Sequence, residues 1–129
     1  MKIAHIAIWT GDLEKEKRFF LRYFECSSDQ KYENKARGFE SYFIDFAGNC
    51  KIELMRRAAV PENKNDPSEE NIGLSHLAIS VGSKEAVDKI TESIKKDGYT
   101  VISGPRKTGD GYYESCILDP EGNRIEITI

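Results

Sequence analysis

The chain has 129 residues, a hydrophobic content of 39% and a net charge of −3 at neutral pH. These values indicate a soluble globular domain with a core of its own, and they exclude a disordered or fibrous chain. The acidic balance gives no attraction to nucleic acid, and no apolar run reaches the roughly 20 residues of a membrane helix.

The three cysteines show no CxxC spacing and their number is odd. A disulfide framework and a thiolate zinc site are therefore not expected. A reducing, cytoplasmic location is expected instead. These residues are Cys26, Cys50 and Cys116.

The first predicted elements are a strand at 3–9 and a helix that ends near Phe24. Asp12 is the expected helix cap, because its carboxylate can accept hydrogen bonds from amides of the first turn. Apolar residues recur on one helical face, which predicts that the helix lies on a sheet. They are Leu13, Phe20, Leu21 and Phe24, and Phe19 and Tyr23 widen the face.

Three strands are predicted next, at 28–33, 39–46 and 50–55, with a hairpin turn at Gly48–Asn49 between the last two. Residues 58–71 contain two prolines and four carboxylates among few apolar residues. This composition predicts a solvated linker.

The second half repeats the same order of elements. A strand at 74–81 precedes a helix with Ser83 as its cap, and helical spacing follows at Val87, Ile90 and Ile94. Strands are then predicted at 99–102, 112–118 and 124–129. We therefore expect an α+β fold of two tandem βαβββ modules, about 1–57 and 72–129, joined in a single domain by the linker.

Two motifs of the first half recur in the second. HIAIWTG begins at His5 and HLAISVG begins at His76, while GNCKIEL at 48–54 corresponds to GNRIEI at 122–127. Each module thus opens with a strand histidine and closes with a strand glutamate. This duplication is the central observation in the sequence.

Strand alternation sets the four repeated polar residues on the sheet face opposite the apolar side chains. If the two curved sheets face each other, His5, Glu53, His76 and Glu126 converge in one cleft. Two imidazoles and two carboxylates suit a divalent ion such as nickel, zinc, cobalt, iron or manganese. The ordinary alternatives are hydrogen-bonded core histidines and solvated glutamates, and the recurrence at nearly equal spacing favours the metal site.

The HIAI and HLAI strands and the closing DPEGNRIEI resemble the vicinal oxygen chelate superfamily along the whole chain. That superfamily includes glyoxalase I, fosfomycin-resistance proteins, methylmalonyl-CoA epimerase, ring-cleaving dioxygenases and bleomycin-binding proteins. The resemblance is strongest to glyoxalase I-like members, because His5, Glu53, His76 and Glu126 match their full ligand set. It implies a metal-dependent enzyme. We also expect a homodimer, in which the modules pair either within one chain or between the two chains, as both arrangements occur in the family.

Further positions follow from this resemblance. The Gly104–Lys107 segment resembles a lysine-bearing loop near the substrate carboxylate, which makes Lys107 a candidate substrate-binding residue. Bacterial glyoxalase I contacts glutathione through an arginine and an asparagine where this chain has Trp9 and Arg57. Trp9 shares the face of His5, so it is expected either in a pocket wall or in the core. Tyr113 is expected either near the cleft or at a hairpin tip.

The favoured function is a glyoxalase-type lyase or isomerase acting on a small vicinal-oxygen substrate. Proton transfer would proceed through a metal-bound enediolate, with Glu126 or Glu53 as general base. The alternatives are a non-catalytic protein that sequesters a drug or metabolite and an enzyme that opens an epoxide antibiotic. The fold alone does not choose among them.

Overall fold

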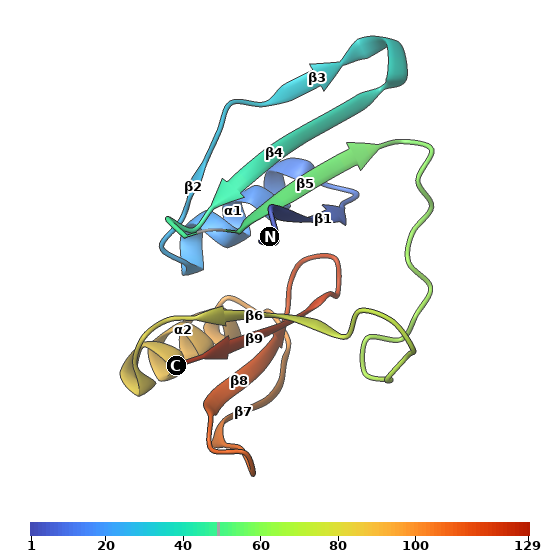
Figure 1. Cartoon of the computed structure of the whole chain (residues 1–129). Coiled ribbons are helices and arrows are strands. Elements are labelled where there is room, and N and C mark those ends of the chain that lie inside the picture. The colour runs from blue at the N-terminus through green and yellow to red at the C-terminus, as the bar shows by residue number, and fades with distance from the viewer. Residues whose placement is uncertain (49) are drawn as a thin grey trace. The chain divides into compact units, whose positions relative to one another are not determined.

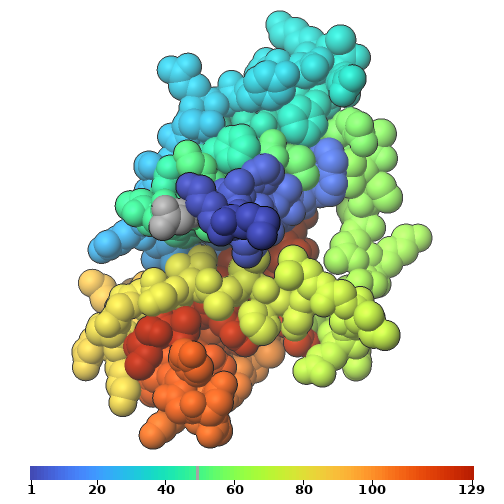
Figure 2. Space-filling view, viewed as in Figure 1, coloured from blue at the N-terminus to red at the C-terminus, as the bar shows by residue number. Residues whose placement is uncertain are grey.

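The computed structural model describes residues 1–48 and 50–129, which form two compact units, Met1–Asn63 and Lys64–Ile129 (Figure 1). The boundary between the units falls inside the segment predicted as a linker, whose side chains are exposed along the surface except for the half-buried Val60 (Figure 2). None of the helices in the described ranges is long and apolar enough to span a membrane.

The first unit is a mixed sheet with one long helix on it. β1 and β5 run parallel, and the remaining pairs are antiparallel in the order β1-β5-β4-β2, with β3 also on β4. Its elements are β1 (His5–Trp9), α1 (Leu13–Tyr23), β2 (Ser27–Ser28), β3 (Tyr32–Asn34), the 3-10 helix η1 (Lys35–Arg37), β4 (Phe39–Asp45) and β5 (Lys51–Arg57).

Helix α1 begins and packs largely as predicted. The Asp12 carboxylate accepts a hydrogen bond from the Lys15 amide at 3.0 Å, which satisfies an amide of the first turn. The predicted apolar face is buried except at Leu21, which is 41% exposed. That assignment was wrong because the buried arc is centred between Glu16 and Phe20, and Leu21 lies beyond its edge.

The strand predicted at 28–33 is wrong as a single element, because β2 and β3 are separated at Asp29. The Asp29 carboxylate accepts from the Phe43 amide at 2.7 Å, and the Asp29 amide donates to the Phe43 carbonyl oxygen at 3.2 Å. A side-chain acceptor thus replaces a backbone acceptor at this point, and the regular ladder is interrupted. Asn49 lies outside the described residues, so the Gly48–Asn49 turn remains a prediction.

The second unit repeats the architecture with strand order β6-β9-β8-β7, in which β6 and β9 are parallel. Ser83 caps its helix as predicted, since its hydroxyl accepts from the Ala86 amide at 3.1 Å. The predicted α+β class with two similar units is confirmed. The elements are β6 (His76–Ser80), α2 (Lys84–Lys96), β7 (Val101–Lys107), β8 (Tyr113–Leu118) and β9 (Arg124–Thr128).

Strand β7 differs most from its prediction. The expected strand at 99–102 and loop at Gly104–Lys107 are replaced by one irregular strand, Val101–Lys107, with two shifts in its register with β8. Gly104 permits this course: its φ is +84°, and an added Cβ would lie 2.6 Å from the Glu114 carbonyl oxygen. Only glycine allows the two backbones to approach so closely there.

An ion-pair network holds α1 to the β3–β4 side of the first unit. Glu14 lies 2.9 Å from Lys17 and 3.1 Å from Lys31, and it accepts a hydrogen bond from the Tyr42 hydroxyl at 2.9 Å. The hydrogen bond from Lys17, together with those from Lys31 and Tyr42, lowers the pKa of Glu14 from 4.5 to about 2, against the opposing effect of desolvation. The network therefore favours the ionised carboxylate.

We predict that Glu14→Gln destabilises the protein at neutral pH. Because the folded-state pKa is depressed, this stabilisation is present above pH 4.5 and is lost as the pH falls towards about 2. Urea unfolding should give a lower midpoint for the variant near neutrality, and the difference from the parent should shrink with acidification. Glu62→Gln, which removes an exposed carboxylate after β5, is the charge-matched control. A Glu14→Gln effect that does not change with pH would contradict this assignment.

Candidate functional site

The first candidate pair lies on the face of its sheet that α1 leaves open. Alternation in β5 buries Ile52 and Leu54 and turns Glu53 to the opposite face. Glu53 is the strand neighbour of Ala7 on β1, two residues beyond His5. The His5 Nε2 and Glu53 Oε2 atoms are 3.7 Å apart, and their side chains are 45% and 19% exposed.

The second unit repeats this arrangement. Ile125 and Ile127 are buried, which leaves Glu126 on the open face beside Ala78 of β6. The His76 Nε2 and Glu126 Oε2 atoms lie 3.1 Å apart, with side-chain exposures of 40% and 23%. Both pairs are therefore accessible from solvent, and each glutamate is more enclosed than its histidine.

A turn fixes the start of the strand that carries Glu126. The carboxylate of Asp119, which is only 4% exposed, accepts hydrogen bonds from the backbone amides of Glu121 and Asn123 at 2.9 and 2.8 Å. The Asn123 side chain donates to the other carboxylate oxygen at 2.8 Å. These bonds hold the DPEGN segment closed, so β9 begins at Arg124 in one register.

The donor atoms of each pair fit two ligands of one divalent ion. Ligand atoms about 2.1 Å from an ion are about 3.0 Å apart at a right angle and about 3.4 Å apart at a tetrahedral angle. The separation of 3.1 Å in the second pair lies in this range, and that of 3.7 Å in the first requires only a slightly wider angle. Imidazole nitrogen and carboxylate oxygen are both ligands of first-row divalent ions.

Each unit supplies two such donors. Among residues 1–48 and 50–129, neither unit contains a group of three or more histidine, cysteine or acidic side chains that could hold a metal ion. The two pairs are therefore equivalent, with one histidine and one glutamate in each unit.

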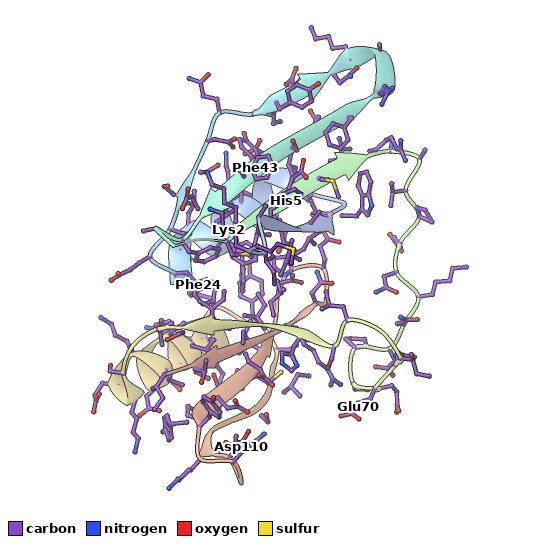
Figure 3. The ribbon with its side chains drawn as sticks, viewed as in Figure 1. Lys2, His5, Phe24, Phe43, Glu70 and Asp110 are labelled. Atoms are coloured by element: carbon purple, nitrogen blue, oxygen red, sulfur yellow. The ribbon has the colours of Figure 1, made fainter. Side chains whose placement is uncertain are left out.

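The residue facing the glutamate from the next strand differs between the units. Phe43 of β4 is opposite Glu53, and its ring meets the His5 ring edge-on at a centroid distance of 5.5 Å (Figure 3). Cys116 of β8 is opposite Glu126. Burial raises the pKa of the Cys116 thiol, and the charge of Glu126 raises it further. This thiol is therefore held protonated and is a poor thiolate ligand or nucleophile.

Trp9 lies on the open face of the first unit, at the far end of β1 from His5. Its ring meets Phe39 edge-on at 6.1 Å, and the Arg57 guanidinium lies over it at 5.4 Å. The indole is 40% exposed. Of the two expectations for Trp9, a place in the buried core is excluded.

Tyr113 and Lys107 lie apart from the His76–Glu126 pair. Tyr113 shares its face of β8 with Ser115, which is bonded to Thr91 of α2, and its hydroxyl donates to the Asp88 carboxylate at 2.7 Å. The sheet therefore separates the Tyr113 side chain from Glu126. Lys107 is the cross-strand partner of Tyr113 and belongs to the same face.

Sequence reasoning missed Arg106, Glu114 and Cys116 as residues of the open face. Glu114 and Cys116 are strand partners of Thr128 and Glu126, and Arg106 forms an ion pair with Glu114 at 3.6 Å. Alternation back from Glu126 through the β8–β9 pairing would have identified the first two. The register shifts in β7 remove any such signal for Arg106.

The chain matches the family model described as the Glyoxalase/Bleomycin resistance protein/Dioxygenase superfamily over residues 2–127. A search of curated protein sequences gives no match.

Solved structures from this family share the fold. A glyoxylase/bleomycin resistance protein/dioxygenase domain from Frankia sp. EAN1pec is 16% identical, with a TM-score of 0.82 over 100% of this chain and 97% of that one. The trypanothione-dependent glyoxalase I of Leishmania major is 19% identical, with a TM-score of 0.78 over 99% of this chain and 86% of its own.

Glyoxalase I from Zea mays is 21% identical, with a TM-score of 0.78 over 98% of this chain. The match covers 44% of the Zea mays protein, so the present chain spans less than half of its length. At these identities the structural likeness establishes the fold and leaves the reaction open.

Proposed function

Because the chain belongs to the glyoxalase/bleomycin resistance protein/dioxygenase superfamily, we propose that it is a metal-dependent lyase or isomerase of the glyoxalase type. Its substrate would be a small molecule with two adjacent oxygen atoms. The single observation that carries the proposal is the duplicated pair, His5–Glu53 and His76–Glu126, on the open face of each sheet.

The four residues of these pairs are the proposed ligand set for one divalent ion, which is nickel, zinc, cobalt, iron or manganese. The ion would supply Lewis-acid stabilisation of negative charge on the substrate oxygens. Imidazole and carboxylate donors support this role, and so does their accessibility, because a catalytic site must leave room for substrate.

The chain's own contribution to the reaction is a carboxylate base. Glu126 or Glu53 would take a proton from the carbon beside the substrate carbonyl and return it to the neighbouring carbon. The Glu53 and Glu126 side chains each lie beside an imidazole and are only 19% and 23% exposed, so each is partly shielded from bulk water. Each pair therefore contains one candidate base.

Sequestration of a drug or metabolite without turnover is the second candidate. The exposed aromatic residues on the open face of the first unit favour it, because rings such as Trp9 can retain a ligand without any chemical step. Metal dependence separates the two candidates: a sequestering protein would bind its ligand as tightly after the metal is removed.

We expect His76→Ala and Glu126→Ala to lose metal while the fold is retained. Loss of a ligand should weaken metal affinity by at least about 100-fold, because changes to residues around the ligands alone cost 10–100-fold. Elemental analysis after dialysis gives the occupancy, and circular dichroism reports folding. Glu114→Ala, which removes a carboxylate from the same open face, should keep its metal. Full metal content in both ligand variants would refute the ligand set.

The thiol used by the enzyme is expected to differ from glutathione. Trp9 and Arg57 stand where bacterial glyoxalase I carries its glutathione contacts, and an indole cannot replace the charge-assisted bonds of an arginine, each worth roughly 1.5–3 kcal/mol. The trypanothione dependence of the Leishmania major relative supports testing more than one thiol.

Steady-state rates with nickel-, cobalt- and zinc-loaded protein would test this expectation. The methylglyoxal–glutathione adduct should react with a kcat/KM well below the roughly 10⁷ M⁻¹s⁻¹ of a fast enzyme, and another thiol adduct should react faster. Fast turnover of the glutathione adduct would show that Trp9 and Arg57 do not exclude it. Metal-loaded protein that turns over none of the adducts would favour sequestration.

We further propose that the protein is a homodimer. Within its own unit the opening strand has a neighbour on one side only, β1 beside β5 and β6 beside β9. Strand edges of this kind are commonly covered by a partner. Light scattering at micromolar concentration should give about twice the 14.6 kDa of one chain. A mass near 14.6 kDa would contradict the proposal.

A further inference from the structure

The two units act as an internal comparison, because the same fold carries two different open faces. The strand positions nearest the histidine and glutamate agree, with alanine at 7 and at 78. The outer positions diverge. Trp9, Met55 and Phe43 in the first unit correspond by strand register to Ser80, Thr128 and Cys116 in the second. Packing of the fold therefore does not require large apolar side chains at these positions.

Three aromatic residues of the first unit and a methionine beside them form a band across its sheet, which we call the aromatic band: Tyr32, Phe39, Trp9 and Met55. Tyr32 meets Phe39 edge-on at 6.1 Å, and Phe39 meets Trp9 edge-on at 6.1 Å. Trp9 is the strand neighbour of Met55. Tyr32 is 55% exposed and Trp9 is 40% exposed, and the residue of the second unit that corresponds to Trp9 is the polar Ser80.

The Arg57 guanidinium lies over this band. Arg57 is the strand partner of Phe39, and its guanidinium lies 5.4 Å from the centre of the Trp9 ring. Among the residues the structure describes, Arg57 forms no ion pair with a carboxylate. Its neighbour Arg56 points to the other face, where it pairs with Glu40 at 3.2 Å and donates to the Gly11 carbonyl oxygen at 3.1 Å.

We propose that the aromatic band and Arg57 select a small planar aromatic molecule that carries an anionic group. A flat ring gains stacking or edge-to-face contacts with Trp9 and Phe39, and a carboxylate or phosphate oxygen is matched by the guanidinium fork. The band comprises four side chains, whereas a protein partner covers roughly 800 Å² on each side. Identification of this molecule as the substrate rests on the proposed function; its binding does not.

Trp9 supplies a direct probe, because it is the only tryptophan in the chain and gives one indole N–H signal in an NMR spectrum. Metal-free protein would be titrated with 2-naphthoate, with neutral 2-naphthalenemethanol and with cyclohexanecarboxylate. The first should shift the indole signal saturably and bind about tenfold or more tighter than either of the others, because each control lacks the anion or the ring. Equal affinity for all three, or no indole shift, would overturn the proposal.

Paired variants separate the band from the general surface. Arg57→Ala should weaken 2-naphthoate binding about tenfold, while Arg56→Ala, on the opposite face, should leave it within about twofold. Tyr32→Ala should weaken it, while Tyr112→Ala, which alters an equally exposed tyrosine of the second unit, should not. Equal effects within either pair would contradict the assignment. An indole shift on simple dilution would contradict it too, because a second copy of the chain would then occupy the band.

Steady-state assays distinguish this inference from the proposed function. If 2-naphthoate binds as stated and metal-loaded protein turns over no thiol adduct, the aromatic-anion site stands and the lyase proposal fails. If thiol adducts are turned over but 2-naphthoate leaves the indole signal unchanged, the lyase stands and the aromatic-anion site fails.

Discussion

The two-residue period of the β-strand is the constraint on which this molecule depends. In β5 and β9 the residues on either side of the glutamate are buried under a helix, so the carboxylate must point to the opposite face. A slip of one residue would place Glu53 or Glu126 in the core and expose isoleucine and leucine. The hydrophobic effect that stabilises each sheet therefore also fixes the direction of the candidate ligands.

This coupling explains why some positions agree between the two units and others differ. Residues under the helix must remain apolar, and the histidine and glutamate must lie near each other, so these positions agree between the units. Positions further along the open face carry neither requirement. Phe43 and Cys116 are equivalent in register, yet one offers an aromatic edge to His5 and the other a protonated thiol beside Glu126. Chemical specificity can therefore change on the open face at little cost to the fold.

The same logic determines how far the sequence could be interpreted. The order of elements, both helix caps and the inward-facing residues of β5 and β9 were predictable because local spacing determines them. Strand pairing was not predictable in this way, and the errors at 28–33 and in β7 depended on it. Tyr113 is expected either near the cleft or at a hairpin tip, because the sequence does not give its parity relative to Ser115, and the strand expected at 99–102 ends before Gly104. Here Gly104 instead allows close approach to Glu114, which depends on tertiary contact.

Arg56 and Arg57 show why direction matters more than residue type in assigning function. Both are exposed arginines at the end of β5, and the residue type alone does not distinguish them. Strand alternation directs Arg56 towards Glu40, where it joins the network that includes Lys31 and Glu14. It directs Arg57 towards the ring of Trp9. A cation already paired with a carboxylate has little to offer an anionic ligand, since its charge is compensated. One over an exposed aromatic ring retains its charge and adds an apolar surface beside it. Arg56 thus contributes to stability and Arg57 to the proposed recognition, because adjacent residues of a strand point to opposite faces of the sheet.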